Sequence, residues 1–263
     1  NLPRPVKAYT TSAMSINRIM ENPSIKTALS IKSLNYSYGS KSILKDIDLE
    51  IPSGEFVIVL GVNGAGKTTL FSLISTLLLM QKGEVRICGH SILSERTAAL
   101  KNIGLVFQHT TLDMDLTVGQ NLTYFAGLQG LAAQDVIARI NDVVNLVDSR
   151  DMLREKVRRL SGGQRRRIEI ARALIGQPRL LIMDEATSNL DVKTKKVLSD
   201  RIRKLSKTAN TTILWSTHRV EEINDKDRVV ILHQGEIYDD DTSEGLRNKY
   251  GKPLETILID LSR

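Results

Sequence analysis

The stretch GEFVIVLGVNGAGKTTL (residues 54–70) joins a short apolar run to a glycine-rich loop. The run FVIVL (56–60) has the length and composition of a strand that is buried on both faces. The loop fits the pattern G-x-x-x-x-G-K-[ST], and the residues after it predict a helix over 67–80. A strand, a glycine-rich loop and a helix in this order predict a phosphate-binding loop in an α/β fold. A chance glycine-rich turn is disfavoured because both flanking elements fit.

The loop has the chemistry to hold a nucleotide and a magnesium ion. Glycines let backbone N–H groups turn inward around a β-phosphate without a clash at Cβ. Lys67 would place a positive charge on the β- and γ-oxygens, the Thr68 hydroxyl can ligate Mg²⁺, and the helix start adds its dipole. We therefore expect the whole loop to bind nucleotide, through Gly61, Val62, Asn63, Gly64, Ala65, Gly66, Lys67, Thr68 and Thr69.

A second apolar run, LLIMDE (180–185), ends in two carboxylates. Asp184, at the end of a buried strand, can lie in the shell of the magnesium ion. Glu185 points to a different face because side chains alternate along a strand, and it could polarise an attacking water as a general base. Two exposed acids at the end of a strand are common in isolation, but beside a phosphate-binding loop we favour the catalytic interpretation.

Composition limits the class of protein. The 263 residues, with 41% hydrophobic and 25% charged side chains, suit one large α/β domain. No apolar run reaches the roughly 18 residues that a membrane span needs. The single cysteine, Cys88, excludes an internal disulfide and a cysteine-based zinc site. The net charge of +7 suits nucleic acid, an anionic membrane or phosphate ligands, and it does not choose among them.

The chain divides into three predicted regions. Residues 1–26 are polar, contain three prolines and predict an N-terminal arm. Residues 27–240 predict the main domain, with half-buried strands before the loop and a hairpin around Gln234 and Gly235. Within it, residues about 109–165 predict a helical insertion, because Val136, Ile140 and Val143 share one helix face. Residues 241–263 predict a helical tail.

The stretch RRLSGGQRRRIEIARAL (158–174) predicts a second helix start that can bind an anion. Its three consecutive arginines cannot share one helix face, so we expect at least one of them to be solvated. With this stretch the set of motifs resembles the ATP-binding subunit of an ATP-binding cassette (ABC) transporter. The matching elements, in chain order, are Tyr38, the loop 61–69, Gln108 in LVFQ, LSGGQ (160–164), Asp184 with Glu185, SNLD (188–191) and His218 in STH.

This resemblance implies a P-loop NTPase core of mainly parallel strands, with an antiparallel β subdomain and an inserted helical subdomain. It implies that Tyr38 stacks on adenine, that Gln108 contacts Mg²⁺ with Thr68 and Asp184, and that Lys67, Glu185 and His218 are catalytic. It also implies that two chains meet head to tail, each capping the other's ATP. The residues that would form this cap are Ser161, Gly162, Gly163 and Gln164.

The implied partners are a second ATP-binding subunit, expected to be an identical chain, and a transmembrane permease. Nucleic acid is not an expected partner. The implied cofactors are ATP and Mg²⁺, and the implied location is peripheral, on the cytoplasmic face of the inner membrane. Segments 112–131, 161–174 and 253–263 resemble exporters of the drug, nodulation-factor and polysaccharide type. Ala186 and Val62 depart from that group's pattern, which often has proline at both positions.

Two alternatives come from other classes. A soluble ABC-type ATPase could act on nucleic acid or ribosomes without a membrane partner, and the positive charge suits it. The second cassette or long coiled coil typical of such proteins does not appear in the 263 residues. A nucleotide sensor without turnover is disfavoured because Glu185 and His218 are both present.

Overall fold

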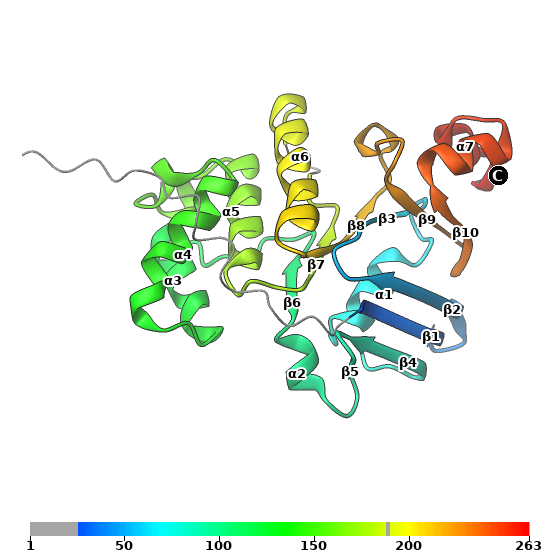
Figure 1. Cartoon of the computed structure of the whole chain (residues 1–263), viewed down its shortest axis with the longest axis horizontal. Coiled ribbons are helices and arrows are strands. Elements are labelled where there is room, and N and C mark those ends of the chain that lie inside the picture. Colours follow the sequence, from blue (N-terminus) through cyan, green and yellow to red (C-terminus); the bar gives the residue numbers. More distant parts are fainter. Residues whose placement is uncertain (1–25, 188–189, 263) are drawn as a thin grey trace, which may run out of the picture.

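The computed structural model describes residues 26–187 and 190–262, and its strands form two sheets (Figure 1). The first sheet is antiparallel, with the order β2-β1-β4-β5. Its strands are β1 (Thr27–Tyr38), β2 (Lys41–Pro52), β4 (Lys82–Ile87) and β5 (His90–Ser91). Residues 1–25 of the predicted N-terminal arm lie outside the described residues.

The second sheet has the order β10-β9-β3-β8-β7-β6, and only β10 runs antiparallel to its neighbour. Its strands are β3 (Phe56–Leu60), β6 (Ile103–Val106), β7 (Leu180–Asp184), β8 (Thr212–Thr217), β9 (Arg228–His233) and β10 (Glu236–Thr242). A mainly parallel sheet beside an antiparallel one confirms the fold class that the sequence predicts.

Helices cover the parallel sheet and extend from one side of it. The α-helices are α1 (Lys67–Ile74), α2 (Arg96–Leu100), α3 (Val118–Leu128), α4 (Ala133–Leu146), α5 (Gly162–Leu174), α6 (Val192–Thr208), α7 (Ser243–Tyr250) and α8 (Leu254–Leu261). The short 3-10 helices are η2 (Arg150–Met152), η3 (Val157–Arg159) and η4 (Val220–Glu222).

The parallel register brings three strand ends to one edge of the sheet. Leu60 of β3 pairs with Thr217 of β8, and Asp184 of β7 pairs with Ser216 of β8. The glycine-rich loop, the residue after Asp184 and the residue after Thr217 therefore leave the sheet together. Ligands bind at this edge in open α/β sheets, because the loops that follow the strands converge there.

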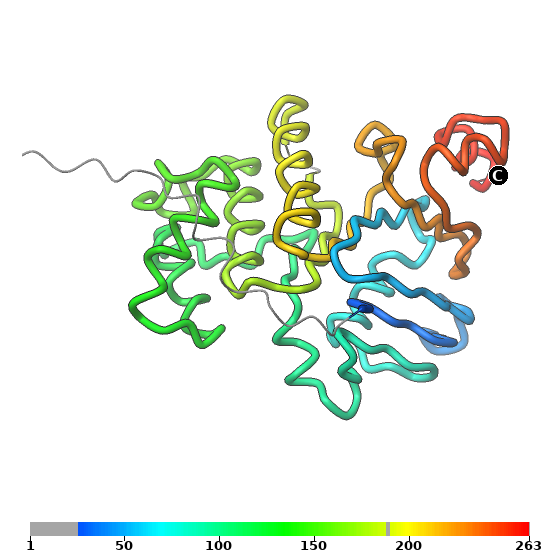
Figure 2. The backbone as a smooth tube through the Cα atoms, viewed as in Figure 1, coloured from blue at the N-terminus to red at the C-terminus, as the bar shows by residue number. Residues whose placement is uncertain are grey.

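The chain between β6 and β7 forms a helical region beside the sheet, drawn in green in Figure 1. The tube in Figure 2 leaves β6, passes through α3 and α4, and returns along α5 to β7. The α4 face that the sequence predicts is turned inward, with Ile140 and Val143 buried beside Val144 and Val147. The same apolar cluster contains Ile213 and Trp215 of β8, so it joins the helices to the sheet.

Helix α1 is shorter than the sequence predicts, so the expected extent of 67–80 is wrong at its end. The helix ends at Ile74, and the Ser75 hydroxyl donates a hydrogen bond to the Phe71 carbonyl, 2.8 Å away. Thr76 then adopts a left-handed conformation with φ of 58°. The Ser75 N–H keeps its own helical hydrogen bond to the Phe71 carbonyl, so the break comes at Thr76, because a left-handed residue ends the helical repeat.

The predicted hairpin and helical tail are both present. Strands β9 and β10 turn at Gln234 and Gly235, which have φ of 48° and 83°. Positive φ at both central residues is the geometry of a tight two-residue hairpin turn. Leu254 and Ile257 of α8 pack with Leu246 of α7 against β3 and β9, so the tail covers this end of the sheet.

The turn at Gly235 gives a stability prediction. A Cβ on Gly235 would overlap the carbonyl oxygen of Ile43 in β2, whereas a Cβ on Gly39, also left-handed, meets nothing within 4 Å. We expect Gly39→Ala to cost only backbone strain, about 1–2 kcal/mol. Gly235→Ala should lower the free energy of unfolding by roughly 2–5 kcal/mol, because a clash adds to the strain. Urea unfolding measures both; equal losses would contradict the proposed contact.

Candidate functional site

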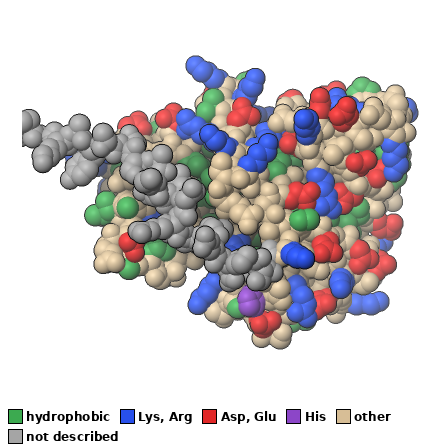
Figure 3. All heavy atoms as spheres, in the orientation of Figure 1, with side chains coloured by type: hydrophobic (Ala, Val, Ile, Leu, Met, Phe, Trp, Pro, Cys, Tyr) green, Lys and Arg blue, Asp and Glu red, His purple; other side chains and the backbone are tan. Residues whose placement is uncertain are grey.

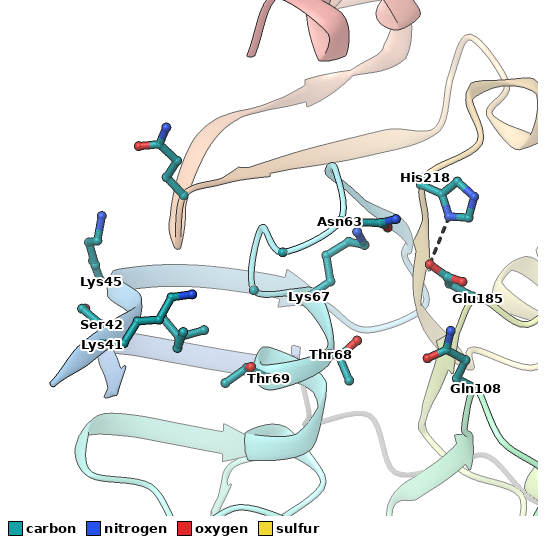
Figure 4. Close-up of a pocket in the computed structure, with 14 residues that line it drawn as sticks. Lys41, Ser42, Lys45, Asn63, Lys67, Thr68, Thr69, Gln108, Glu185 and His218 are labelled. Carbon is teal, nitrogen blue, oxygen red and sulfur yellow. Dashed lines mark hydrogen bonds and ion pairs between the residues drawn. The ribbon is translucent and has the colours of Figure 1, made fainter. Parts of the chain in front are cut away.

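A cavity of about 640 Å³ lies at the edge of the sheet where the loops converge (Figure 4). Nine of the residues predicted from sequence line it: Asn63, Gly64, Gly66, Lys67, Thr68, Thr69, Gln108, Glu185 and His218. The structure thus gathers residues from four separate segments of the chain into one site.

The glycine-rich loop holds the Lys67 ammonium close to its own backbone. Lys67 Nζ donates to the carbonyl oxygens of Gly61, at 2.7 Å, and Val62, at 3.1 Å. Burial lowers the pKa of Lys67, and the nearby carboxylates of Glu185 and Asp184 oppose that shift. In Figure 4 the side chain lies along the loop at the start of α1. A cation at a helix start with little water around it favours a multiply charged anion.

Glycine at position 61 lets the loop approach β9. A Cβ on Gly61 would lie 2.5 Å from the Leu232 carbonyl oxygen, so any other residue would push the two segments apart. Gly66, directly before α1, has φ of 110°, a conformation that side chains rarely adopt. The turn into the helix therefore depends on glycine at this position.

The acidic pair at the end of β7 is held by Ser216 on the neighbouring strand. The Ser216 hydroxyl donates to Asp184 Oδ1, and the Glu185 N–H approaches that hydroxyl oxygen at 3.1 Å. Asp184 is buried, and Glu185 turns into a left-handed conformation with φ of 47°. The turn brings Glu185 Oε1 within 3.0 Å of His218 Nδ1, as Figure 4 shows. Strain of this kind persists at sites where surrounding contacts over-determine the backbone.

Arg166, near the start of α5, connects the backbone beside Gln108 to the backbone around Glu185. Its guanidinium donates to the carbonyl oxygens of Phe107, Asp184 and Ala186, and its side chain is buried. Phe107 directly precedes Gln108, so one arginine fixes the backbone beside both Gln108 and the acidic pair. Burial lowers the pKa of Arg166, with Glu169 and the acidic pair opposing the shift. Of the three consecutive arginines, 165 and 167 are half-buried, so the solvated arginine expected from sequence is not found.

Glu169, one turn further along α5, holds the segment that follows Gln108. Its carboxylate accepts hydrogen bonds from Thr110, Thr111 and Leu112 over distances of 2.6–3.2 Å. Arg172 of the same helix lies 3.2 Å away and supplies the compensating charge. Helix α5 therefore fixes the chain on both sides of Gln108, through Arg166 before it and Glu169 after it.

Several predicted residues lie outside this cavity. Tyr38 ends β1 with 51% of its surface exposed and makes an edge contact with Tyr36, so its role in adenine binding stays a prediction. None of the residues 161–164 lines the cavity. Gly162 instead borders a separate hollow of about 220 Å³ beside Gln108 and Arg165. Within SNLD, residues 188–189 lie outside the described residues.

Strand β2 contributes to the cavity in a way that the sequence did not reveal. Lys41, Ser42, Ile43 and Lys45 line it, together with Gln234 from the β9–β10 hairpin. Figure 4 shows Lys41 and Ser42 on the side of the cavity opposite Glu185. The alternation of β2 predicts a half-buried strand, but it carries no signal for which other element its polar side chains face.

The donor set suits Mg²⁺ bound together with a phosphate. Thr68 and Gln108 line the cavity, and both also border an adjacent hollow that Asp184 lines, so the three oxygen-bearing side chains lie near one another. No group of three or more His, Cys, Asp or Glu side chains that could hold a metal occurs in the described residues. Mg²⁺ takes oxygen ligands and is usually held by one or two carboxylates with water and substrate phosphates, so one carboxylate with a hydroxyl and an amide oxygen fits it.

Comparison with known proteins identifies the family. Residues 44–188 match the model of the family described as ABC transporter. The chain belongs to this family. Over 226 residues it is 36% identical to the daunorubicin resistance ATP-binding protein DrrA3 of Streptomyces coeruleorubidus, an alignment that covers 86% of this chain and 71% of DrrA3.

A second relative is an importer component. The chain is 34% identical over 223 residues to the spermidine/putrescine import ATP-binding protein PotA of Haemophilus influenzae (strain 86-028NP), which covers 84% of this chain and 60% of PotA. The chain thus spans less than two thirds of that relative. The name of PotA states import, whereas the name of DrrA3 states drug resistance, so the two names do not give one direction of transport.

A solved structure agrees with the fold and the chemistry. The ATP-binding cassette MJ0796, as a dimer in a post-hydrolysis state bound to ADP and Pi, superposes with a TM-score of 0.74 at 27% identity, covering 81% of this chain and 98% of that one. The chain is accordingly an ABC-family ATPase. Within the described residues, no helix has both the length and the apolar character needed to cross a membrane.

Lys67 gives the first prediction about ligand binding. Lys67→Ala should weaken ATP binding by roughly 10- to 100-fold, because a charge-assisted contact contributes about 1.5–3 kcal/mol. Titration with a fluorescent ATP analogue measures the dissociation constant. Lys82→Ala, at an exposed position in β4, is the matched control and should bind as the wild type does. Unchanged affinity in Lys67→Ala would contradict the placement of the phosphates.

Proposed function

We propose that this chain binds and hydrolyses ATP as a dimer and drives export through a separate transmembrane subunit. One observation carries the proposal. The lysine loop, Glu185 and His218 line one cavity, while the second predicted anion-binding helix start, at Ser161, does not line it. A chain that holds both halves of a site apart requires another copy to complete it.

Different residues of the site bind the phosphates of ATP and orient the attacking water. Lys67 and the loop amides bind the β- and γ-phosphates, and their charge offsets the charge that develops during transfer. Thr68, Gln108 and Asp184 would hold Mg²⁺, which would supply positive charge against the phosphates. Glu185 orients the attacking water as its general base, and His218, 3.0 Å from Glu185 Oε1, keeps that carboxylate in place.

The start of α5 is suited to cap a phosphate from outside. Ser161 and Gln164 form a capping box in which each side chain accepts a hydrogen bond from the other residue's N–H. A helix start leaves the first N–H groups without acceptors in the helix, and the box uses neither of those of Gly162 and Gly163. These amides and the helix dipole are therefore directed at an anion bound by another subunit.

Three further lines support export over the alternative of a soluble ATPase that acts on nucleic acid or ribosomes. The segments 112–131, 161–174 and 253–263 resemble exporter ATPases, and DrrA3 bears the name of a drug-resistance protein. On the face that Figure 3 shows, the charges do not form one basic surface, because Lys and Arg are interspersed with Asp and Glu over much of it. The chain would then bind a permease at the cytoplasmic face of the inner membrane. Co-purification with a membrane protein distinguishes the two functions.

The proposed base gives a prediction about the closed dimer. Glu185→Gln should lower ATP hydrolysis by about 100-fold or more while ATP still binds, because general bases contribute roughly 10²–10⁴-fold. With ATP and Mg²⁺ bound and hydrolysis blocked, the variant should elute as a dimer in size-exclusion chromatography with light scattering. Hydrolysis at the wild-type rate would contradict the role of Glu185. A strictly monomeric, ATP-loaded variant would contradict the dimer.

A mixing experiment tests whether two chains share each site. Lys67→Ala inactivates a chain's own loop, and Gly162→Asp places a negative charge at the predicted cap, where a Cβ meets nothing within 4 Å. Each variant alone should be inactive. An equal mixture should recover up to about a quarter of the wild-type rate, because half the dimers are mixed and each has one intact site. Sites contained within single chains would give no recovery.

A further inference from the structure

The carboxylate of Glu222 connects two loops that border the proposed catalytic site. Its Oε1 accepts a hydrogen bond from the Thr187 hydroxyl at 2.6 Å, and its Oε2 accepts one from the Thr217 hydroxyl at 2.9 Å. Both threonines are almost fully buried, at 1% and 3% exposure. Each oxygen of one side chain therefore holds one buried hydroxyl.

The two threonines flank the pair that the proposed function makes catalytic. Thr187 lies two residues after Glu185, and Thr217 directly precedes His218. Glu185 and His218 come from different strands and meet through a single contact of 3.0 Å. We propose that Glu222 is a positioning residue that keeps Glu185 and His218 within reach of each other. This inference rests on the proposed function, because it assumes that the pair performs the chemistry.

Glu222 is itself held in a fixed place. Arg203 of α6 donates to its backbone carbonyl and forms an ion pair with the buried Asp227, at 2.8 Å. The Thr217 hydroxyl also accepts a hydrogen bond from the Arg219 N–H at 3.0 Å, which links the residue before His218 to the residue after it. A carboxylate with this support can hold the two loops in one arrangement, since charged hydrogen bonds are shorter and stronger than neutral ones.

The bridge that Glu222 forms between Thr187 and Thr217 should affect catalysis and not ATP binding. The lysine loop binds the phosphates through residues that Glu222 does not touch, so loss of the bridge should leave ATP binding intact. Glu185 and His218 would move independently, and the alignment of the attacking water would be lost. An interaction needed only in the transition state lowers kcat and leaves KM unchanged.

The test compares Glu222→Ala and Glu222→Gln in the full chain, with steady-state ATP hydrolysis and a melting temperature for each. We expect Glu222→Ala to lower kcat by about tenfold or more with KM for ATP within about twofold of wild type. Glu222→Gln keeps an acceptor for one threonine and offers a donor to the other, so it should recover most of the rate. Glu221→Ala, at the exposed neighbouring position, is the matched control and should match the wild type.

Two outcomes would overturn the inference: a Glu222→Ala kcat within about twofold of wild type, or a KM that rises as kcat falls, as general damage to the site predicts. If Glu222→Ala does not fold, Thr217→Val replaces it. Thr217→Val removes one hydroxyl at constant shape and should lower kcat at constant KM; an unchanged kcat overturns the inference.

The activity of Glu185→Gln is measured alongside. Full activity in that variant defeats the proposed function, whereas an inactive Glu185→Gln with a fully active Glu222→Ala defeats this inference alone.

Discussion

The arrangement of the site depends on one buried guanidinium. Arg166 donates to the carbonyl oxygens of Phe107, Asp184 and Ala186, which lie on two segments separated by more than seventy residues. Burying an arginine is unfavourable unless its donors are used, and the lowered pKa of Arg166 reflects that desolvation. Because its planar fork has fixed donor directions, the arginine sets the position of both segments relative to α5. The helix start at Ser161 and the edges of the cavity therefore form one unit.

This connection bears on why the two predicted anion-binding helix starts would not compete. Helix α1 starts at the cavity, where it would face the chain's own nucleotide, whereas the start of α5 does not line the cavity and belongs to the helix whose Arg166 fixes Phe107. In a dimer of such chains, a shift of α5 toward the partner's phosphate would displace the backbone on either side of Gln108. The start of α5, which would cap the partner's nucleotide, and Gln108, beside the chain's own nucleotide, would then move together. Coupling of this kind needs an element with two arrangements that both ligands bias.

Local signals in the sequence were sufficient for the centre of the fold and for part of the site. The run FVIVL, the loop and α1 follow from one motif, and the hairpin follows from Gln234 and Gly235. The end of α1 could not be predicted, because it depends on a left-handed conformation at Thr76, which a β-branched residue rarely adopts. The burial of Arg166 and the bridge through Glu222 depend on partners far along the chain. Adjacent arginines or glutamates give no periodic signal that distinguishes the member with distant partners from its neighbours.

The polar character of these connections has a physical reason. Glu169 is 1% exposed and accepts four hydrogen bonds from residues 110–112, with Arg172 beside it. A buried ion pair contributes little net stability, since desolvation offsets most of the Coulomb attraction. It does penalise every arrangement that leaves one of its partners unpaired. Apolar side chains between α5 and the segment after Gln108 would permit sliding by an ångström at little cost. Catalysis on a phosphate loses much of its rate from such a displacement, and directional hydrogen bonds to a buried carboxylate prevent it.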